Sequence, residues 1–196
     1  MKSIAIFASG SGSNAQEIIR YFKGHQYIKV SLVVTNKKDA GVLNVAKYAS
    51  IPTKIIHKED IYPSANLLNI LHEHKIDFIV LAGFLWLLPT DLIQAYTNKI
   101  TNIHPSLLPK YGGKGMYGHF VHEAVKANHE QESGITIHLV NEKYDEGRIL
   151  CQKSCQISDK ITANEIASKI LELEHKYYSK TIEKYMNELF KLVHGQ

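Results

Sequence analysis

Short apolar segments alternate along the chain with segments of helical spacing. The strand-like segments are β-branched or continuously apolar and cover residues 4–8, 28–35, 53–56, 77–82 and 100–104. Apolar residues three or four positions apart predict helices over 14–23, 42–49, 67–74, 90–96 and 119–128. The run 77–82 is uninterrupted, which is typical of a parallel strand covered on both faces. This order predicts an α/β protein with an open, doubly wound, mostly parallel sheet.

Two later strands, 134–140 and 148–156, are too close in sequence for a crossover helix, so we expect them to be antiparallel. A long helical stretch, 162–193, follows, with a cap near Ser158 or Thr162. We see no repeat and no linker, and expect one domain over residues 1–196. Ligands of such sheets bind beyond the carboxyl ends of the strands, which directs attention to the loops 9–14, 83–88, 105–118 and 141–147.

Composition narrows the class of protein. Hydrophobic residues make up 44% and charged residues 21% of the 196 residues, which is ordinary globular usage and disfavours disorder and coiled coil. No apolar run approaches the roughly 18 residues of a membrane helix, and the first apolar stretch is too short for a signal peptide. The net charge of +4 is dispersed, which predicts a weak preference for anions and no nucleic-acid partner.

The cysteines and most histidines indicate no special chemistry. Cys151 and Cys155 share a strand face and are interpreted as small core residues in a reducing, cytoplasmic compartment. The sequence has no paired metal-ligand motif, so no metal site is expected. His138 is interpreted as a core or surface residue. Solvated helix faces account for the remaining helical histidines, His72, His74, His119, His122 and His129.

A glycine-rich turn follows the first strand and begins the first helix. Gly12, Ser13 and Asn14 offer a close backbone approach, helix N–H groups and side-chain donors, all of which suit an anion, and Ser13 and Asn14 can also cap the helix. A plain β-to-α turn is the competing interpretation. The turn fits a loose dinucleotide fingerprint, but the strand 28–35 ends in Asn36 and lysines rather than in an acid. A monophosphate is the ligand that fits best.

The strand 100–104 ends in a polar pair. Asn102 and His104 are two residues apart, so both side chains lie on one face, and Pro105 ends the strand. An amide donor beside an imidazole suits a developing oxyanion and proton transfer. The competing interpretation is a satisfied polar pair at a strand end.

Two loops offer further candidates. Asp145 lies between the two late strands as either a hairpin-turn residue or a carboxylate that approaches His104 and favours its imidazolium form. The apolar loop 83–89 contains the only tryptophan, Trp86. It either packs under the next helix or forms a wall for a flat aromatic ligand.

Several of these motifs, in this order, resemble one enzyme family across nearly the whole chain. They are 10–14 (GSGSN), 81–84 (LAGF), 102–111 (NIHPSLLPKY), 134–138 (GITIH) and 144–147 (YDEG). The chain is thus similar to the folate-dependent phosphoribosylglycinamide formyltransferases of purine synthesis. The resemblance implies transfer of the formyl group of 10-formyltetrahydrofolate to the amine of glycinamide ribonucleotide, without a metal.

The resemblance also implies roles for individual residues. Asn102 and His104 would stabilise the tetrahedral oxyanion, with His104 as the acid and Asp145 raising its pKa. Gly12, Ser13 and Asn14 would hold the ribotide phosphate. Glu174 would contact the ribose, although by itself it looks like an exposed helix residue. The pterin of the folate would lie against two loops, represented by Phe84, Leu85, Trp86, Leu87, Leu88, Asn141 and Tyr144.

The chain departs from the family pattern at three places. Segment 58–63 is short and lacks arginine, Trp86 stands where many relatives have an arginine, and 112–118 is rich in glycine where many relatives have a histidine-containing turn. The length predicts the transfer domain alone, as a monomer or homodimer, which disfavours the two-domain deformylases of formyltetrahydrofolate and formyltransferases of methionyl-tRNA. A catalytically silent ligand-binding subunit is the alternative of a different class, and the retained Asn102, His104 and Asp145 argue against it.

Overall fold

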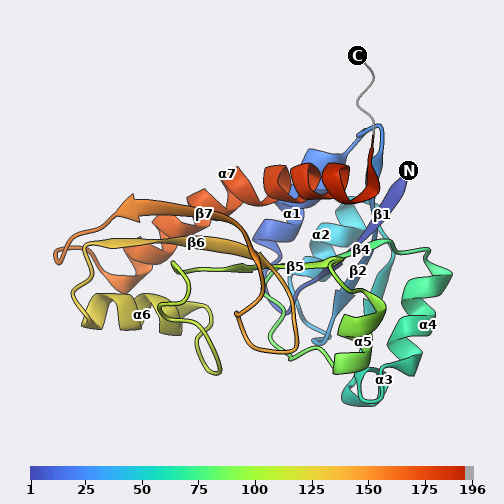
Figure 1. The fold of residues 1–196 in the computed structure, drawn as a ribbon, viewed down its shortest axis with the longest axis horizontal. Coiled ribbons are helices and arrows are strands. Elements are labelled where there is room, and N and C mark those ends of the chain that lie inside the picture. Colours follow the sequence, from blue (N-terminus) through green and yellow to red (C-terminus); the bar gives the residue numbers. More distant parts are fainter. Residues whose placement is uncertain (193–196) are drawn as a thin grey trace.

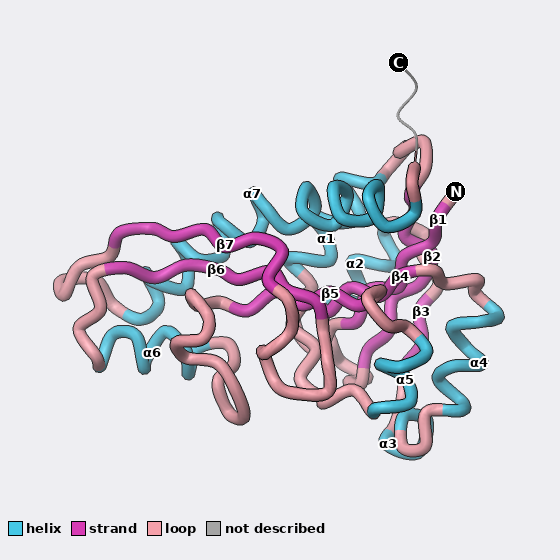
Figure 2. Tube along the Cα trace, in the orientation of Figure 1, coloured by secondary structure: helices cyan, strands magenta, loops and turns pink. Residues whose placement is uncertain are grey.

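The structure, a computed structural model, describes residues 1–192. Its strands form one seven-stranded sheet in the order β3-β2-β1-β4-β5-β6-β7 (Figures 1 and 2). The strands are β1 (Lys2–Phe7), β2 (Ile28–Thr35), β3 (Thr53–Ile55), β4 (Phe78–Leu81), β5 (Ile100–His104), β6 (Glu132–Leu139) and β7 (Ile149–Gln156). Strands β1 to β5 pair in parallel, and β6 is antiparallel to both β5 and β7. The predicted α/β class and the antiparallel late pair are confirmed.

Helices cover both faces of the sheet. They are α1 (Ser13–Phe22), α2 (Val42–Tyr48), α3 (Lys58–Ile61), α4 (Ala65–Glu73), α5 (Thr90–Ala95), α6 (His119–Ala127) and α7 (Ala163–Phe190). Alternate residues of β1 enter separate cores: Ile4 and Ile6 pack with α1, α2, α6 and α7, whereas Ala5 and Phe7 pack with α3, α4 and α5. The period of two in a strand therefore supplies both hydrophobic layers from one segment. Figure 1 shows α1 and α7 together on one side of the sheet and α3 to α5 on the other.

The long helix α7 is anchored at its start and along its length. Thr162 caps it, accepting the Glu165 N–H at 3.2 Å, while the Glu165 carboxylate accepts the Thr162 N–H at 2.7 Å. The fully buried Tyr178 donates its hydroxyl to the carbonyl of Leu81 at 2.8 Å, at the end of β4. Because this bond joins α7 to the carboxyl end of the parallel strands, the helix supports the edge where ligands bind.

Most differences from the expected elements lie at their ends. Strand β6 begins at Glu132, two residues earlier than expected, and α4 begins at Ala65. The four-residue helix α3 was not predicted, because it is too short to show helical periodicity; Asp60 supports it by accepting the His57 N–H at 2.8 Å. Helix α7 ends at Phe190, and the expected end at Val193 lies outside the described residues.

The strand order reverses between β1 and β4. Strand β1 pairs with β2 on one side and with β4 on the other, so the connections that leave the ends of β1 and β4 diverge. A crevice at this topological switch point is the usual ligand site of an open α/β sheet. The glycine-rich turn follows β1 and the loop 83–89 follows β4, so both predicted ligand loops begin at the crevice.

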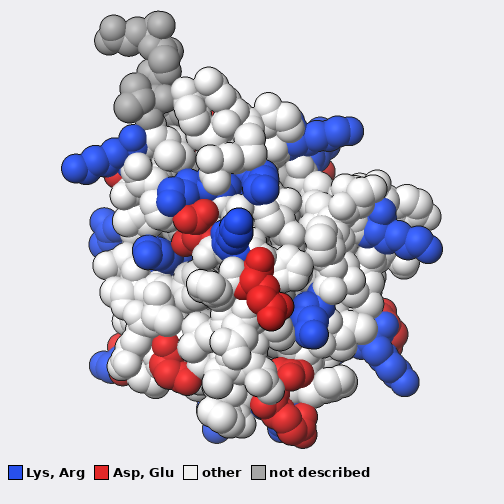
Figure 3. Space-filling model, turned by 90° about the vertical axis from the view of Figure 1, so that its right-hand side faces the viewer, with Lys and Arg blue, Asp and Glu red and all other residues white. Residues whose placement is uncertain are grey.

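The surface charge is mixed. On the face drawn in Figure 3, Lys and Arg side chains are interspersed with Asp and Glu side chains and do not merge into one basic surface. Among residues 1–192, no helix is long and apolar enough to cross a membrane.

Candidate active site

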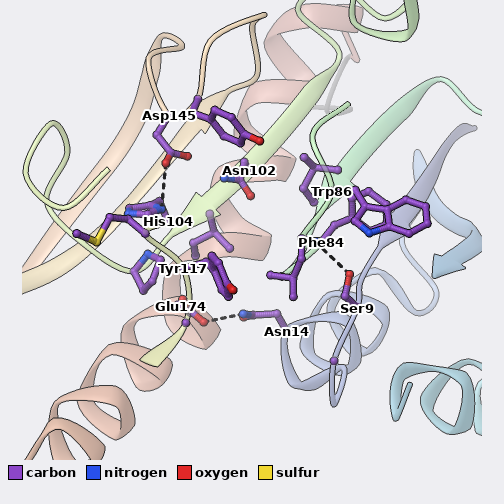
Figure 4. A pocket seen from close by; sticks show the side chains of 18 of the residues that line it. Ser9, Asn14, Phe84, Trp86, Asn102, His104, Tyr117, Asp145 and Glu174 are labelled. Atoms are coloured by element: carbon purple, nitrogen blue, oxygen red, sulfur yellow. Dashed lines mark hydrogen bonds and ion pairs between the residues drawn. The ribbon is translucent and has the colours of Figure 1, made fainter. Parts of the chain in front are cut away.

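A cleft of about 880 Å³ opens at the carboxyl ends of β1, β4 and β5. Residues from all four predicted ligand loops line it, together with α6 and α7 (Figure 4). The tertiary structure thus joins segments more than 160 residues apart, from Ser9 to Glu174, around a single cleft.

The residues of the glycine-rich turn at the start of α1 differ in what they contact. Gly12 precedes the helix with φ of 85°, and a Cβ there would lie 2.7 Å from the Cα of Val42, so only glycine fits this position. Ser13 and Asn14 line the cleft, but Gly12 does not. Neither side chain caps α1, which differs from the expectation, because Gly12 occupies the N-cap position and Ser13 and Asn14 are the first helical residues. Because Ser13 and Asn14 begin α1 and line the cleft, the first turn of this helix faces the cleft, which favours an anion there.

Ser9 joins the two loops of the switch point and was not singled out from the sequence. Its hydroxyl donates to Asn36 Oδ1 at 2.7 Å and accepts the Leu85 N–H at 3.1 Å. One side chain therefore links the ends of β1 and β2 to the loop that follows β4. A serine in a glycine-rich turn gives no local signal of such a long-range role.

Glu174 of α7 faces the start of α1. Asn14 Nδ2 donates to Glu174 Oε2 at 2.6 Å, and the Glu174 side chain is half-buried beside the cleft rather than exposed as its helical context indicated. Burial raises the pKa of Glu174 to about 7, and the Asn14 hydrogen bond opposes this shift without cancelling it. The carboxyl group therefore takes up a proton near neutral pH.

Asn102 and His104 lie on the same face of β5, as predicted, and both line the cleft. His104 is almost fully buried, and its Nε2 donates to the carbonyl of Tyr111 at 2.7 Å. Pro105 follows at once and ends the strand. The side chains are thus fixed at the end of a regular element, which holds them more firmly than a loop would.

Asp145 approaches His104 from the loop between β6 and β7. Its Oδ2 lies 3.6 Å from His104 Nδ1 and accepts the Gly113 N–H at 2.9 Å. Asp145 has φ of 55°, a left-handed conformation that Asp tolerates better than most residues. A Cβ on Gly147 would lie 1.7 Å from the carbonyl oxygen of Leu139, so glycine permits the return of this loop. The predicted approach of Asp145 to His104 is present.

The pKa values of this pair shift in the same direction for different reasons. Burial lowers the pKa of His104, and this outweighs the Asp145 carboxylate and the Tyr111 carbonyl, which raise it. The resemblance implies a raised pKa for His104. The Asp145 carboxylate does act to raise it, but the effect of burial is larger. Burial raises the pKa of Asp145, but contacts with His138, His104 and the Gly113 N–H together lower it. Asp145 is thus held as a carboxylate, and the His104 imidazolium is a stronger acid than free histidine.

His138, for which a core or surface position is expected, completes this cluster. It pairs with Asn102 in the β5–β6 register and is almost fully buried. Its Nδ1 donates to the Leu139 carbonyl at 2.9 Å, and its Nε2 lies 3.3 Å from Asn102 Nδ2. The same Nε2 lies 3.6 Å from Asp145 Oδ1. His138 therefore orients the Asn102 amide.

His122 of α6 corrects a second expectation. It is 6% exposed rather than solvated, and it lines the cleft. Burial lowers its pKa to about 4, with smaller contributions from His104 and His119, so the ring is neutral at physiological pH. The spacing of residues on α6 does not reveal this burial, which depends on packing of the helix beneath the cleft.

The apolar loop after β4 forms the opposite wall of the cleft. Phe84 and Leu88 are buried, whereas Leu85 and Leu87 are exposed at the rim. The ring of Trp86 meets that of Phe84 edge-on at 6.3 Å, so both sequence interpretations hold: the indole packs on the core and also lines the cleft. This wall suits a flat, partly apolar ligand.

Asn141 and Tyr144 line the cleft on the loop that also contains Asp145. Asn141 Oδ1 accepts the Lys143 N–H at 3.0 Å, and the Tyr144 side chain is exposed at the rim. Every predicted site residue except Gly12 therefore lines one cleft. Over residues 1–192, no cluster of three or more His, Cys, Asp or Glu side chains is arranged to hold a metal ion.

The fold and this cleft define a class of enzyme. A helix start for an anion, an apolar wall for a flat ligand and an amide–imidazole–carboxylate group meet at one cleft, and together they suit group transfer through a charged tetrahedral intermediate. Sequence comparison agrees: the formyl transferase family matches residues 2–182. The chain belongs to this family, and it is a formyltransferase.

Individual relatives are close along most of the chain. The chloroplastic phosphoribosylglycinamide formyltransferase of Arabidopsis thaliana is 41% identical, over 97% of this chain and 67% of its own length. The phosphoribosylglycinamide formyltransferase of Bacillus subtilis is 35% identical over 95% of each chain. The crystal structure of that enzyme from Bacillus halodurans matches with a TM-score of 0.87, 35% identity and coverage of 97% of this chain and 98% of its own.

Proposed function

We propose that this enzyme transfers the formyl group of 10-formyltetrahydrofolate to the amine of glycinamide ribonucleotide in purine synthesis. The amine nitrogen bonds to the formyl carbon, the bond from that carbon to N10 of the folate breaks, and the proton lost by the amine ends on N10. The products are formylglycinamide ribonucleotide and tetrahydrofolate. Atoms and charge balance without a metal or a redox cofactor.

The residues of the buried cluster take the chemical roles. Asn102 Nδ2 and the His104 imidazolium donate to the oxyanion of the tetrahedral intermediate, and His104 supplies a proton toward the departing N10. Asp145, held as a carboxylate, keeps the imidazolium accessible despite burial. Hydrogen-bond donors placed where charge develops are a large term in catalysis. His138 acts through Asn102 as a positioning residue.

The binding residues divide between the two substrates. Ser13 and Asn14, at the helix start that Gly12 shapes, hold the ribotide phosphate, and Glu174 receives the ribose hydroxyls. The pterin lies along the apolar wall, Phe84, Leu85, Trp86, Leu87 and Leu88, and against Asn141 and Tyr144. The observation that supports this division most is spatial: the start of α1, the apolar wall and the reacting cluster line different sides of one cleft (Figure 4).

A turnover assay tests the function. Purified protein is mixed with glycinamide ribonucleotide and a 10-formylfolate analogue, and release of the deformylated folate is followed by absorbance. We expect turnover that requires the ribotide. Formate release without ribotide would instead identify a deformylase, and binding of either substrate without turnover would identify a silent binding subunit.

The wider setting of the enzyme follows from the same proposal. Its partners are the two small substrates, with no nucleic acid and no membrane, and residues 1–196 act as a single domain in a monomer or homodimer. The cytoplasm suits the free thiols of Cys151 and Cys155.

A further inference from the structure

The loop 111–118 connects the catalytic cluster to α6. Its first residues are tied to that cluster, because the Tyr111 carbonyl accepts from His104 and the Gly113 N–H donates to Asp145. Its last residue, Gly118, precedes α6 with φ of 52° and ψ of −131°. The loop thus contacts the reacting groups at one end and continues into α6 at the other.

The middle of this loop is shaped by glycine rather than by packing. Gly113 and Gly115 have φ of 94° and 90°, which side chains rarely adopt, and an added Cβ at either would meet no atom within 4 Å. These glycines therefore serve the path of the backbone. That path delivers the two residues that follow Gly115, Met116 and Tyr117, to the cleft.

Tyr117 is a large polar aromatic residue that no role so far described requires. It is 45% exposed, and its ring is held edge-on against Phe120 at 5.2 Å. In Figure 4 the ring enters the cleft, and its hydroxyl end is directed to the side where Asn14 and Glu174 meet. Within residues 1–192 the hydroxyl has no hydrogen-bond partner, although the ring is positioned. A positioned phenol facing open space is arranged for a ligand.

We infer that Tyr117 is a binding residue for the acceptor substrate, with its hydroxyl hydrogen-bonded to the sugar or amide part of the ribotide; this inference rests on the proposed function. A phenol both donates and accepts, which matches a molecule rich in hydroxyl and amide groups. Tyr117 lies on the Asn14–Glu174 side of the cleft, away from the apolar wall, so the folate is not its ligand. The loop then contacts the acceptor through Tyr117 and the catalytic pair through Tyr111 and Gly113.

The test replaces only the hydroxyl. Tyr117→Phe retains the ring and its contact with Phe120, and Tyr48→Phe, at a residue 91% exposed outside the cleft, is the matched control. Loss of one neutral hydrogen bond should raise KM for the ribotide about threefold to tenfold, with kcat and the KM for the folate unchanged. Calorimetry with glycinamide ribonucleotide alone should show the same weakening without any turnover.

The outcomes separate this inference from the proposed function. If Tyr117→Phe binds and uses the ribotide as wild type does, or if the folate KM rises instead, the role of Tyr117 is wrong while the function stands. If wild-type protein neither binds nor formylates the ribotide, the proposed function itself fails, and the inference fails with it. A weakened ribotide binding in Tyr117→Phe but not in Tyr48→Phe supports both.

Discussion

The carboxyl groups at the two polar ends of the cleft have pKa values shifted in opposite directions. Asp145, at the His104 end, is half-buried but faces two imidazoles and one backbone N–H, and its pKa falls below the ordinary value. Glu174, at the α1 end, has a single amide donor, and burial raises its pKa to about 7. Burial opposes charge at both places, so the number and kind of partners decide the outcome.

This difference in pKa suits two different tasks, favouring an imidazolium at one end and tolerating a phosphate at the other. The His104 end keeps a carboxylate that favours the His104 imidazolium. At the other end a phosphate is expected beside the start of α1, where a second full negative charge would be repelled. A Glu174 that is protonated near neutral pH avoids that repulsion and can donate as well as accept. The predictions below test each side of this contrast.

Removal of the acid should have the largest effect. His104→Ala should lower kcat by about 10²–10⁴-fold, the usual contribution of general acid–base catalysis, and leave ribotide binding intact. Steady-state kinetics and calorimetry check the two parts separately. His129→Ala, a change at an exposed histidine outside the cleft, is the control. Unchanged turnover in His104→Ala would remove this residue from the mechanism.

Removal of the Asp145 carboxylate should come next. In Asp145→Asn the pKa of His104 should fall further, because the carboxylate is a main group that raises it. Each unit costs about tenfold in imidazolium at neutral pH, so kcat at pH 7 should drop roughly 10–100-fold. The deficit should shrink as the pH is lowered. A deficit independent of pH, or an equal loss in the nearby exposed Glu146→Gln, would contradict this role.

The α1 end predicts a pH-dependent change in stability. Since the folded-state pKa of Glu174 is about 7 and exceeds the unfolded value, its contribution to stability falls as the pH rises from about 4.5 to 7. Glu174→Gln still accepts from Asn14 and should stabilise the protein by roughly 2 kcal/mol at pH 8 but hardly at pH 4.5. Denaturant titrations at both pH values measure this. The exposed Glu172→Gln should show no such pH dependence, and a gain at neither pH would refute the raised pKa.

A change in the apolar wall, across the cleft from His104, should give the smallest effect. Trp86→Leu keeps an apolar surface but loses the aromatic face, which is worth about 0.5–1.5 kcal/mol. The KM for the folate should rise about twofold to tenfold, with kcat and the ribotide KM unchanged. Kinetics with each substrate varied in turn provide the internal control. A change in the KM for the ribotide instead would show that the indole contacts the ribotide and would contradict its place in the folate site.

Much of the architecture could be predicted because its signals are local. The bounds of β2 and β5 agree with the expected strands, and the cap at Thr162 was one of two candidates. The α3 helix was not predicted because four residues are too few to show a helical period of apolar residues. Two histidines show the limit of local patterns. The sequence around His122 is typical of a solvated helix face, and that around His138 is typical of a core or surface strand residue. Neither pattern indicates that both side chains are buried beside the cleft.

The sequence by itself determined the α/β order, the glycine-rich turn at the start of the first helix and the shared face of Asn102 and His104. Each follows from a period of two or 3.6 or from the conformational range of one residue. Only the tertiary structure decided that Asp145 returns to His104, and that Asn14 meets Glu174, 160 residues away. It also decided the directions of their pKa shifts. Strand register, loop return and burial depend on packing among distant segments, which no local pattern of residues specifies.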